Sequence, residues 1–557
     1  MPDLSIGHSP VERGLRLEGQ TVVRIAIAVC FLALVVLAYA RNVNWDEFHF
    51  LSLVYAFLDG SLDRPMQTFY VHGFSWLTWI PGNEVQQVFA ARLVMIGFLV
   101  VTALSIHRIA RVFTNQLSAD IAVLAFLTSG FLLAHGGSFR ADPMAAAFLT
   151  SSVAILMTTR MSALHIVSAA VLSALAVLVT IKSALFLPAY LAVLIWRKDE
   201  HGVLFRIVVS GVLAGLLCVL LYSWHASGIV VAEGKGTAAN ATEAANRTLL
   251  KSGLVPRSAE IVSWIVFSLA QLALITWGIL DRRGARVKVV LVLFAMPLLT
   301  VVIYRNAFAY FFPFAIPLLM VAVAIGAQRI ERSKYLPPLV AIMLISVAVQ
   351  VILIWPEINR SQRATLAEVH RLFDEPVPYI DDSHMVSSFP GSGFLMSTWA
   401  VAKYNDRGIP IFADIVEKHR PPFLLTTKTA LLRAMLPSLP ASGRTKLLPE
   451  DEEVLRRSYV HYSGAIWLAG REVELNGEVS TVRLPFPGRY RVEATQPVVI
   501  NGQTISDGMV IALEDALIAL DGPAGAIVRL IWDTGVTPIS KDSLSLRIYA
   551  GFQGLLL

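Results

Sequence analysis

The chain has 557 residues, of which 55% are hydrophobic and only 15% charged, and its mean hydropathy is +0.63. This composition excludes an ordinary soluble domain and indicates a protein that crosses a membrane several times. The formal net charge is a modest +6. The two cysteines, Cys30 and Cys218, both lie in apolar stretches, so no disulfide framework is expected.

Eleven apolar runs precede residue 356, and a membrane-spanning helix needs about 20 apolar residues. The first run ends in "LAYA", which resembles a signal-peptide cleavage site, but its length favours an uncleaved anchor. The sixth run is short and nearly fused to the fifth. The runs cover residues 21–40, 86–106, 117–135, 141–158, 163–180, 183–196, 203–223, 259–279, 287–303, 309–327 and 335–355.

Basic residues gather in every second loop, which predicts that these loops are cytoplasmic. The N-terminus, residues 1–20, is then expected inside. After eleven crossings, residues 356–557 are expected outside, which is the periplasm if this is a bacterial inner membrane protein. The basic residues are Arg13, Arg16, Arg108, Arg111, Arg160, Arg197, Lys198, Arg206, Arg282, Arg283, Arg286, Lys288, Arg329, Arg332 and Lys334.

The loops on the opposite face combine acids with cations. Asp46 and Glu47 come directly after the first run, in "NWDEFHFL", within the outer loop 41–85. Carboxylates for proton transfer and cations for phosphate are what a site for an anionic lipid headgroup needs. Taken singly, each charge is explained as simply by its preference for the membrane interface. The cations are Arg140 in "HGGSFRADP", Lys182, Arg305 in "IYRNAFAYFFP", and Lys235, Arg247, Lys251 and Arg257 in the outer loop 224–258.

Five segments, in this order, resemble the GT-C superfamily of polyprenyl-phosphate-dependent glycosyltransferases. The resemblance is greatest to the branch that holds protein O-mannosyltransferases, the lipid A aminoarabinose transferase and the core galacturonosyltransferases. It spans about residues 20–355, and in the fourth segment Ser183 and Ala184 replace the Gly and Pro of the family. The segments are "NWDEFHFL", "HGFSWLTWI" with "NEVQQVFAARLVMIGF", "SFRADPMAAAF", "IKSALFLPAYL" and "YRNAFAYFFPFAIPLLMVAVA".

This resemblance implies an inverting transfer of a sugar from a polyprenyl-phosphate donor to an envelope acceptor, which is lipid A or lipopolysaccharide core, a glycan or a protein. It implies that Asp46 takes the acceptor proton as general base, and that Glu47 binds the acceptor or holds Asp46 in place. The leaving phosphate needs cations. The predicted phosphate and donor contacts are Arg92, Arg140, Lys182, Arg305 and Tyr310.

Several of these residues also have plainer explanations. Arg92 lies about two turns inside the second run, where it either pairs with a phosphate or carboxylate or snorkels. Asp142 is a candidate substrate contact, but it directly precedes Pro143 and is explained as a helix N-cap. His49 and His72 are candidate acceptor contacts or plain interfacial histidines, and Tyr310 also fits an aromatic belt. No motif with metal-ligand spacing occurs, so neither a metal nor a cofactor is expected.

The part beyond residue 355 is predicted to contain an α/β region, 356–457, and a β-rich domain, 458–557. Residues 361–374 show the helical spacing of Leu366, Val369, Leu372 and Phe373. The β-rich domain is expected to be a small sandwich or barrel that either binds acceptor glycan or serves as a lid or partner surface. Its predicted strands are "AIWLAG", "VSTVRLPF", "GRYRVEA", "PVVING", "GMVIALED", "AIVRLIWD" and "LSLRIYAG".

A lipid or sugar transporter or flippase is the alternative function. Transporters tend to have internal repeats and helices broken near the middle of the membrane. The sequence has no clear repeat, and its polar groups cluster at one face, which favours an enzyme. A scaffold without activity would not need the set of acids and cations.

Overall fold

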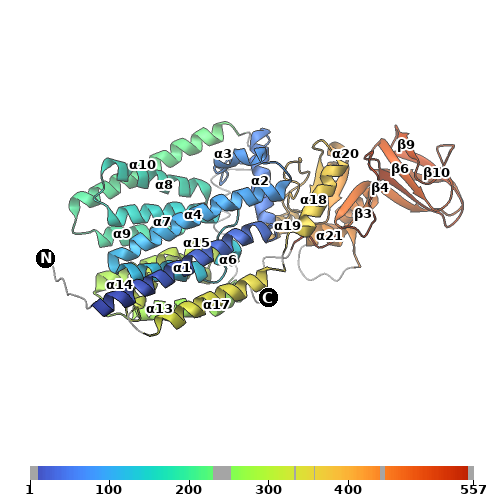
Figure 1. The fold of residues 1–557 in the computed structure, drawn as a ribbon. Coiled ribbons are helices and arrows are strands. Elements are labelled where there is room, and N and C mark those ends of the chain that lie inside the picture. Colours follow the sequence, from blue (N-terminus) through green and yellow to red (C-terminus); the bar gives the residue numbers. More distant parts are fainter. Residues whose placement is uncertain (1–9, 230–252, 332–333, 357, 439–445, 550–557) are drawn as a thin grey trace.

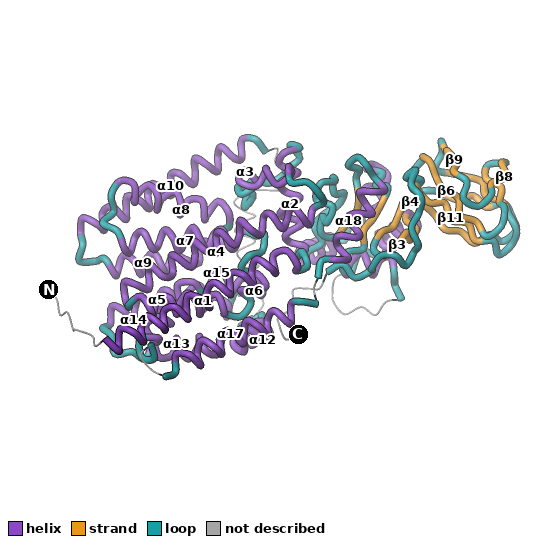
Figure 2. The backbone as a smooth tube through the Cα atoms, in the orientation of Figure 1, coloured by secondary structure: helices purple, strands orange, loops and turns teal. Residues whose placement is uncertain are grey.

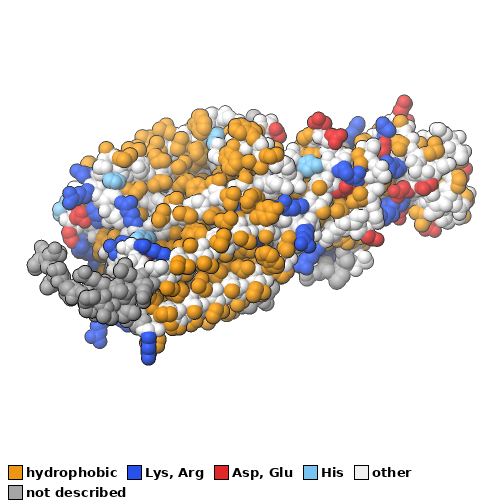
Figure 3. Space-filling view, in the orientation of Figure 1, with side chains coloured by type: hydrophobic (Ala, Val, Ile, Leu, Met, Phe, Trp, Pro, Cys, Tyr) orange, Lys and Arg blue, Asp and Glu red, His pale blue; other side chains and the backbone are white. Residues whose placement is uncertain are grey.

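The structure, a computed structural model, describes residues 10–229, 253–331, 334–356, 358–438 and 446–549. A bundle of long helices and a C-terminal part that contains all the labelled strands are arranged end to end (Figures 1 and 2). Apolar side chains cover the visible flank of the helical bundle, and lysines and arginines gather at its end far from the C-terminal part (Figure 3). Apolar side chains on the flank and charged side chains at the end are the distribution expected of a protein that spans a membrane.

The helical bundle follows the predicted runs closely. The two elements α2 and α3 lie between α1 and α4, in the predicted outer loop 41–85. The helices are α1 (Pro10–Ala40), α2 (Trp45–Leu58), α3 (Val71–Phe74), η1 (Ser75–Trp79), α4 (Glu84–Phe113), α5 (Gln116–Thr128), α6 (Leu132–His135), α7 (Ala141–Thr158), α8 (Ala163–Val179), η2 (Ile181–Phe186), α9 (Leu187–Trp196), α10 (His201–Ser227), α12 (Ser258–Val266), α13 (Leu269–Ile279), α14 (Ala285–Leu299), η3 (Thr300–Val302), η4 (Ala309–Phe311), α15 (Phe312–Ala315), η5 (Pro317–Leu319), α16 (Met320–Ala327) and α17 (Leu336–Ile354).

Each of the eleven predicted runs coincides with a helix or a group of consecutive helices, but the number of spans stays a prediction. Among the described residues, 6 helices are long and apolar enough to cross a membrane, or up to 8 if each bent pair is one span. The pair Ser258–Val266 and Leu269–Ile279 is bent by 88°, and the pair Ala309–Ala315 and Pro317–Ala327 by 50°. Three shorter apolar helices account for the remaining runs.

Helix α10 shows most clearly that the bundle needs an apolar solvent. Only 11% of its most apolar window is buried inside the protein. Phe205 and Val212 are 71% and 70% exposed. Such a continuous apolar surface is unfavourable in water and favourable in lipid. The chain is a multi-pass membrane protein.

Two glycines let helices α13 and α16 approach until their backbones touch. A Cβ atom on Gly278 would lie 2.0 Å from the carbonyl oxygen of Ala322, and one on Gly326 would lie 2.0 Å from that of Leu274. Small residues at such crossings are typical of helix packing in membranes. This contact fixes α13 against α16.

The basic loops meet at the end of the bundle far from the C-terminal part. Arg206 donates to the carbonyl of Arg160 at 3.0 Å, and Arg283 donates to that of Phe113 at 2.5 Å. Arg108 of α4 also donates to the hydroxyl of Thr158 at the end of α7 at 2.9 Å, so the loops that follow α4, α7 and α13 share one face. Arg332, predicted to lie there, is outside the described residues.

The C-terminal part packs on the other end, where α1 and α17 both finish. Arg41 and Ile358 form an isolated antiparallel β-bridge. The side chain of Gln362 accepts from the backbone of Val43 at 2.8 Å and donates back to its carbonyl at 2.7 Å. The acidic "NWDE" segment and the C-terminal part therefore lie at the same end of the bundle.

A second contact ties the C-terminal part to the start of α4. Glu84 is buried and accepts hydrogen bonds from His370 at 3.0 Å and from the hydroxyl of Ser388 at 2.5 Å. The bond to Glu84 raises the pKa of His370, against the opposing effect of burial. Buried polar bonds of this kind need both partners in place, so they fix the orientation of the two parts.

The C-terminal part begins with five helices around a small sheet and ends in strands. The helices are α18 (Arg360–Leu372), α19 (Thr398–Arg407), α20 (Phe412–His419), α21 (Thr429–Met435) and α22 (Pro449–Ser458). The strands are β1 (Tyr379–Asp381), β2 (Phe423–Leu425), β3 (Tyr459–Ser463), β4 (Ile466–Glu474), β5 (Ser480–Arg483), β6 (Gly488–Ala494), β7 (Val498–Ile500), β8 (Gln503–Ile505), β9 (Val510–Leu513), β10 (Leu517–Asp521) and β11 (Ile527–Trp532).

Strand β4 links the α/β region to the β-rich domain. Its first half pairs with β2 and β3, and its second half pairs with β11. The larger sheet has the order β1-β2-β4-β11-β6-β9, with β3 also paired to β4, and the smaller sheet has the order β5-β10-β7-β8. The predicted boundary at residue 457 thus falls just before β3. One continuous sheet contains strands from both sides of this boundary.

The two sheets enclose a shared apolar core, so the predicted sandwich is confirmed. Val492 and Leu530 from the larger sheet and Ile500 and Leu520 from the smaller one belong to the same buried cluster. The alternation of buried and exposed residues along β10 is that expected of a strand with one face on a core.

Two local predictions had opposite outcomes. The predicted amphipathic helix is α18, and Leu366, Val369, Leu372 and Phe373 are all buried. The strand predicted at "LSLRIYAG" is wrong, because residues 544–549 form no strand and the rest lies outside the described residues. Instead, Leu544 packs against the turn at Gly464, and Tyr549 packs against Trp45 of α2. These contacts fix the segment without a neighbouring strand.

Candidate active site

The acidic pair begins helix α2, and the local sequence explains why. Asn44 is the N-cap, and its side chain accepts from the backbone N–H of Asp46 at 2.9 Å. The carboxylate of Glu47 accepts from the backbone N–H of Asn44 at 2.9 Å, which completes a capping box. Both acids lie in the first turn, where the helix dipole favours negative charge.

Glu47 points into the protein and is fully buried. Its carboxylate accepts two hydrogen bonds from Arg92, at 2.8 and 2.6 Å, and one from the backbone N–H of Phe139 at 2.8 Å. Arg41 lies 3.9 Å from it. Burial raises the pKa of this carboxyl, but Arg92 outweighs burial and holds the pKa at about 2.

Arg92 is occupied entirely by protein acceptors. Besides its two bonds to Glu47, it donates to the carbonyls of Ala38 at 2.9 Å, Arg41 at 3.0 Å and Asn42 at 2.8 Å. These five bonds use all five N–H donors of a guanidinium group. Arg92 therefore joins the end of α1 to α2 and α4, and none of its donors is left for the donor phosphate proposed from the sequence.

Asp46 points the other way and begins a chain of ion pairs with alternating charge. It contacts Arg140, whose Nε lies 3.5 Å from the carboxylate of Asp142. Asp142 in turn accepts from the ammonium of Lys182 at 2.5 Å. The ring of Tyr310 lies beneath both cations, 3.6 Å from the guanidinium carbon of Arg140 and 5.1 Å from the Nζ of Lys182.

Asp142 was expected to be the N-cap residue of α7, and this prediction is wrong. The N-cap residue is Arg140, and Asp142 lies within the first turn. Its carboxylate is buried and holds Arg140 and Lys182 together. Pro143 follows at the third helical position, where a missing N–H is tolerated.

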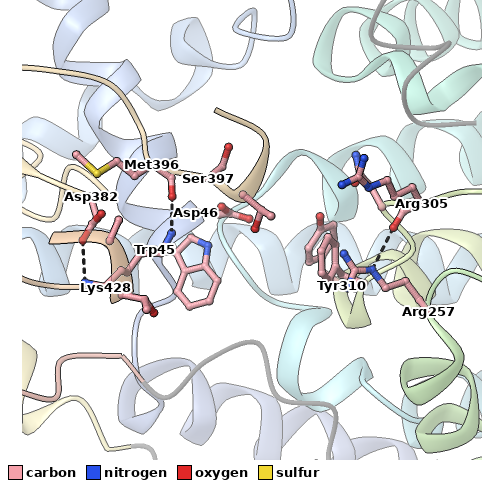
Figure 4. A pocket seen from close by; sticks show the side chains of 14 residues that line it. Trp45, Asp46, Arg257, Arg305, Tyr310, Asp382, Met396, Ser397 and Lys428 are labelled. Carbon is pink, nitrogen blue, oxygen red and sulfur yellow. Dashed lines mark hydrogen bonds between the residues drawn. The ribbon is translucent and has the colours of Figure 1, made fainter. Parts of the chain in front are cut away.

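A cavity of about 310 Å³ lies between the helical bundle and the C-terminal part (Figure 4). Asp46 is in the middle of the labelled residues. Arg305 and Tyr310 are on one side, and Asp382 and Lys428 are on the other. The bundle contributes Trp45, Asp46, Arg257, Arg305, Phe308 and Tyr310, and the C-terminal part contributes Asp382, Met396, Ser397, Thr398, Lys428 and Thr429.

Among the predicted site residues, the cavity thus brings together Asp46, Arg305 and Tyr310. Lys182 does not line it and contacts Asp142 instead. Arg257 also lines the cavity. Its Nε donates to the carbonyl of Arg305 at 3.1 Å, and its guanidinium carbon lies 3.6 Å above the ring of Phe308.

Sequence reasoning missed the role of Arg257 and the whole contribution of the C-terminal part. Arg257 was one of four cations in the loop 224–258, and the other three lie in residues 230–252, outside the described part. The position of Arg257 next to the apolar run 259–279 was the only signal that could have separated it from them. Asp382 and Lys428 had no signal, because they are ordinary charged residues of a predicted α/β region.

The predicted histidine contacts do not line the cavity. His49 is half-buried, with its Nε2 2.7 Å from the guanidinium of Arg64, and desolvation lowers its pKa well below the usual value. His72 stacks on Trp224 with ring centroids 4.5 Å apart and shares a hydrogen bond with His225 at 2.9 Å. Burial also lowers the pKa of His72. Both rings are held by protein contacts.

Among the described residues, no three His, Cys, Asp or Glu side chains lie in a group that could hold a metal ion.

No protein-family model and no curated protein matches the sequence, so the comparison rests on solved structures. The apo crystal structure of ArnT from Cupriavidus metallidurans is 14% identical and has a TM-score of 0.52; the match covers 75% of this chain and 94% of that chain. The structure of ArnT bound to undecaprenyl phosphate is also 14% identical, with a TM-score of 0.49 and coverage of 76% and 96%. An Archaeoglobus fulgidus oligosaccharyltransferase tethered with an acceptor peptide is 11% identical, with a TM-score of 0.43 and coverage of 74% and 69%.

The class defined by fold and site is a multi-pass membrane protein with a charged cavity where its helical bundle meets a C-terminal part. Within that class, the chain has the fold of ArnT, the lipid A aminoarabinose transferase. The predicted resemblance is thereby confirmed for the fold.

Proposed function

We propose that this protein is a membrane glycosyltransferase that moves a sugar from a polyprenyl-phosphate donor to an acceptor of the cell envelope, which is lipid A or core, a glycan or a protein. The observation that carries the proposal is the position of Asp46. This carboxylate reaches a cavity that has two arginines at one end and a separate folded part at the other (Figure 4). A general base between a phosphate site and an acceptor site is the arrangement that glycosyl transfer from a lipid phosphate needs.

The proposed reaction is a single displacement at the anomeric carbon. The acceptor hydroxyl oxygen forms a bond to C1 of the sugar while its proton passes to Asp46. The bond between C1 and the phosphate oxygen breaks, and polyprenyl phosphate leaves with the electron pair. Attack from the face opposite the leaving group inverts the configuration at C1.

Arg257 and Arg305 are proposed to hold the leaving phosphate. Both line the same end of the cavity, and the planar guanidinium group can donate to two phosphate oxygens at once. Arg140 and Lys182 are proposed to act mainly through the ion-pair chain, in which Asp142 binds both cations and Arg140 orients Asp46. This division of roles follows from position, because Arg257 and Arg305 line the cavity whereas Arg140 and Lys182 do not.

A transporter remains the alternative, and the position of the polar cavity favours the enzyme. Substrate sites of transporters lie near the middle of the bilayer, between helices. Here the cavity lies at one end of the bundle and is closed by residues of a non-membrane part. That position suits chemistry on a headgroup at the membrane surface.

Replacing Arg257 or Arg305 with Ala is expected to weaken the binding of undecaprenyl phosphate by about ten- to a hundredfold, because a hydrogen bond to a charged group contributes about 1.5–3 kcal/mol. The measurement is titration of the purified protein with undecaprenyl phosphate. Arg160→Ala, at the far end of the bundle, is the control and should bind normally. Unchanged binding in both cavity variants would mean that these arginines only anchor the protein at the interface.

We further propose that the C-terminal part is periplasmic in a bacterial inner membrane, because the basic loops meet at the opposite end of the bundle. An alkaline phosphatase fused after the C-terminus is then expected to be active, and a green fluorescent protein fused there to be dark. Fusions to the loop between α7 and α8 should show the reverse. An active phosphatase at that loop and an inactive one at the C-terminus would reject both this orientation and a periplasmic site.

A further inference from the structure

The cavity has two chemically different ends (Figure 4). The end formed by the helical bundle carries Arg257 and Arg305. The end formed by the C-terminal part carries a carboxyl group, an ammonium group and hydroxyl groups, from Asp382, Lys428 and Thr429. An anion is favoured at the first end, whereas the second end offers donors and acceptors together.

Lys428 stands where the two parts meet. Its Nζ lies 4.6 Å from the centre of the Trp45 ring and donates to the carbonyl of Met396 at 3.4 Å. Its backbone N–H donates to Oδ2 of Asp382 at 3.1 Å. The ammonium group therefore lies beside α2, the helix that carries Asp46, and it has donor capacity beyond the one bond to Met396.

Asp382 is buried with one oxygen unused. Its side chain is 0% exposed, and Oδ1 has no hydrogen-bond partner within the part of the chain that the structure describes. Burial raises the pKa of this carboxyl to about 7, against the lowering effect of Lys428. A buried polar atom without a partner is unfavourable, and such atoms in folded proteins call for a specific explanation.

The neighbouring Asp381 is an acid whose two carboxylate oxygens both accept hydrogen bonds within the protein. Its carboxylate accepts from the backbone N–H of Met385 at 2.6 Å and from the hydroxyls of Thr427 and Ser383. It is also buried, but it does not line the cavity. The two adjacent acids at the end of β1 thus differ in whether their oxygens are already satisfied.

We propose that Asp382 and Lys428 form the acceptor subsite, and that the group they recognise is a sugar bearing several hydroxyls rather than a phosphate. When Asp382 is ionised, its unused oxygen needs an O–H or N–H donor, which a sugar hydroxyl provides and a fully ionised phosphate does not. Lys428 donates to a second hydroxyl oxygen, while Trp45 and Met396 supply apolar surface for the ring carbons.

This inference rests on the proposed function, since it places one hydroxyl of the same sugar next to Asp46. That hydroxyl gives its proton to Asp46 as its oxygen bonds to C1 of the donor sugar. Asp382 and Lys428 hold other hydroxyls and exchange no proton in the step. They are therefore binding residues for the acceptor.

The test uses the purified full-length protein and two fractions from a strain that lacks it. An organic-solvent extract supplies the lipid-linked donor, and the delipidated envelope supplies the acceptor, titrated to find the amount for half-maximal transfer. The variants are Asp382→Asn and Lys428→Gln. Each is expected to raise this amount by about ten- to a hundredfold, as for the loss of a hydrogen bond to a charged group.

Two controls separate this proposal from the proposed function. Binding of undecaprenyl phosphate should be unchanged in both variants, and Asp381→Asn should alter thermal stability without raising the half-maximal amount.

If the wild-type protein neither transfers sugar nor binds undecaprenyl phosphate, the proposed function itself fails. If the wild type transfers and both variants match it, only the acceptor subsite is rejected. Should Asp382→Asn not fold, Lys428→Gln decides, because Lys428 is only half-buried.

The chemical class of the acceptor is tested by treating the acceptor fraction before the assay. Periodate, which cleaves vicinal diols of sugars, is expected to abolish transfer, and phosphatase is expected to leave it intact. Transfer that is lost on phosphatase treatment and survives periodate would overturn the sugar assignment and identify a phosphate as the recognised group.

Discussion

Asp46→Asn is expected to lower the rate of sugar transfer by about 10²–10⁴-fold, the usual cost of losing a general base. The substitution keeps the shape of the side chain and can still contact Arg140, so α2 should form normally. Binding of undecaprenyl phosphate should persist, because Arg257 and Arg305 are unchanged. The measurement is the single-turnover rate at saturating donor, alongside the binding titration.

Asp59→Asn is the matched control for this experiment, because Asp59 is an exposed acid at the other end of α2. It should transfer sugar at the wild-type rate. Full activity of Asp46→Asn would refute the role of general base. Loss of folding in Asp46→Asn would show instead that the acid is structural and that its ion pair with Arg140 is its main contribution.

Arg92→Met is expected to be the most destabilising single change in the helical bundle. It leaves the carboxylate of Glu47 buried without its partner, and breaking a buried ion pair costs about 3–5 kcal/mol. The carbonyls of Ala38, Arg41 and Asn42 also lose their donor. The measurement is thermal unfolding in detergent, followed as the fraction of monodisperse protein.

Arg108→Met on the same helix is the control, because Arg108 is exposed near the far end of α4 and should unfold at the wild-type temperature. Glu47→Gln should be destabilising too, by leaving Arg92 uncompensated. Since the pKa of Glu47 is about 2 in the fold and near 4.5 otherwise, the stability from ionised Glu47 is complete above pH 4.5 and is lost as the pH falls towards 2. If Arg92→Met unfolds at the wild-type temperature, the bonds of Arg92 do not stabilise the contact of α1 with α2 and α4.

These two experiments assign different roles to two adjacent acids. Asp46 and Glu47 are neighbours of the same chemical type, and the sequence placed both in the site. In the structure, Glu47 is fully buried against Arg92, whereas the side chain of Asp46 is 24% exposed. Chemistry with a substrate is therefore expected from Asp46, and stability from Glu47.

The sequence by itself determined the features that depend on residues close together along the chain. Hydropathy summed over about 20 residues identified the membrane runs, because transfer into lipid is nearly additive along a helix. The apolar spacing of Leu366, Val369 and Leu372 is equally local, and it was found in α18. The alternation of apolar residues near the C-terminus predicted the sandwich for the same reason.

Only the tertiary structure decided which charges meet. Arg92 reaches Glu47 across 45 residues, and Asp382 and Lys428 reach the cavity of Asp46 from the C-terminal part. An ion pair or a cavity depends on which segments pack together, and neither hydropathy nor spacing carries that information. The local sequence around a charged residue near a membrane boundary does not show whether the residue joins two helices, as Arg92 does, or lines a cavity, as Arg305 does. The difference arises from burial and from the partners that packing supplies.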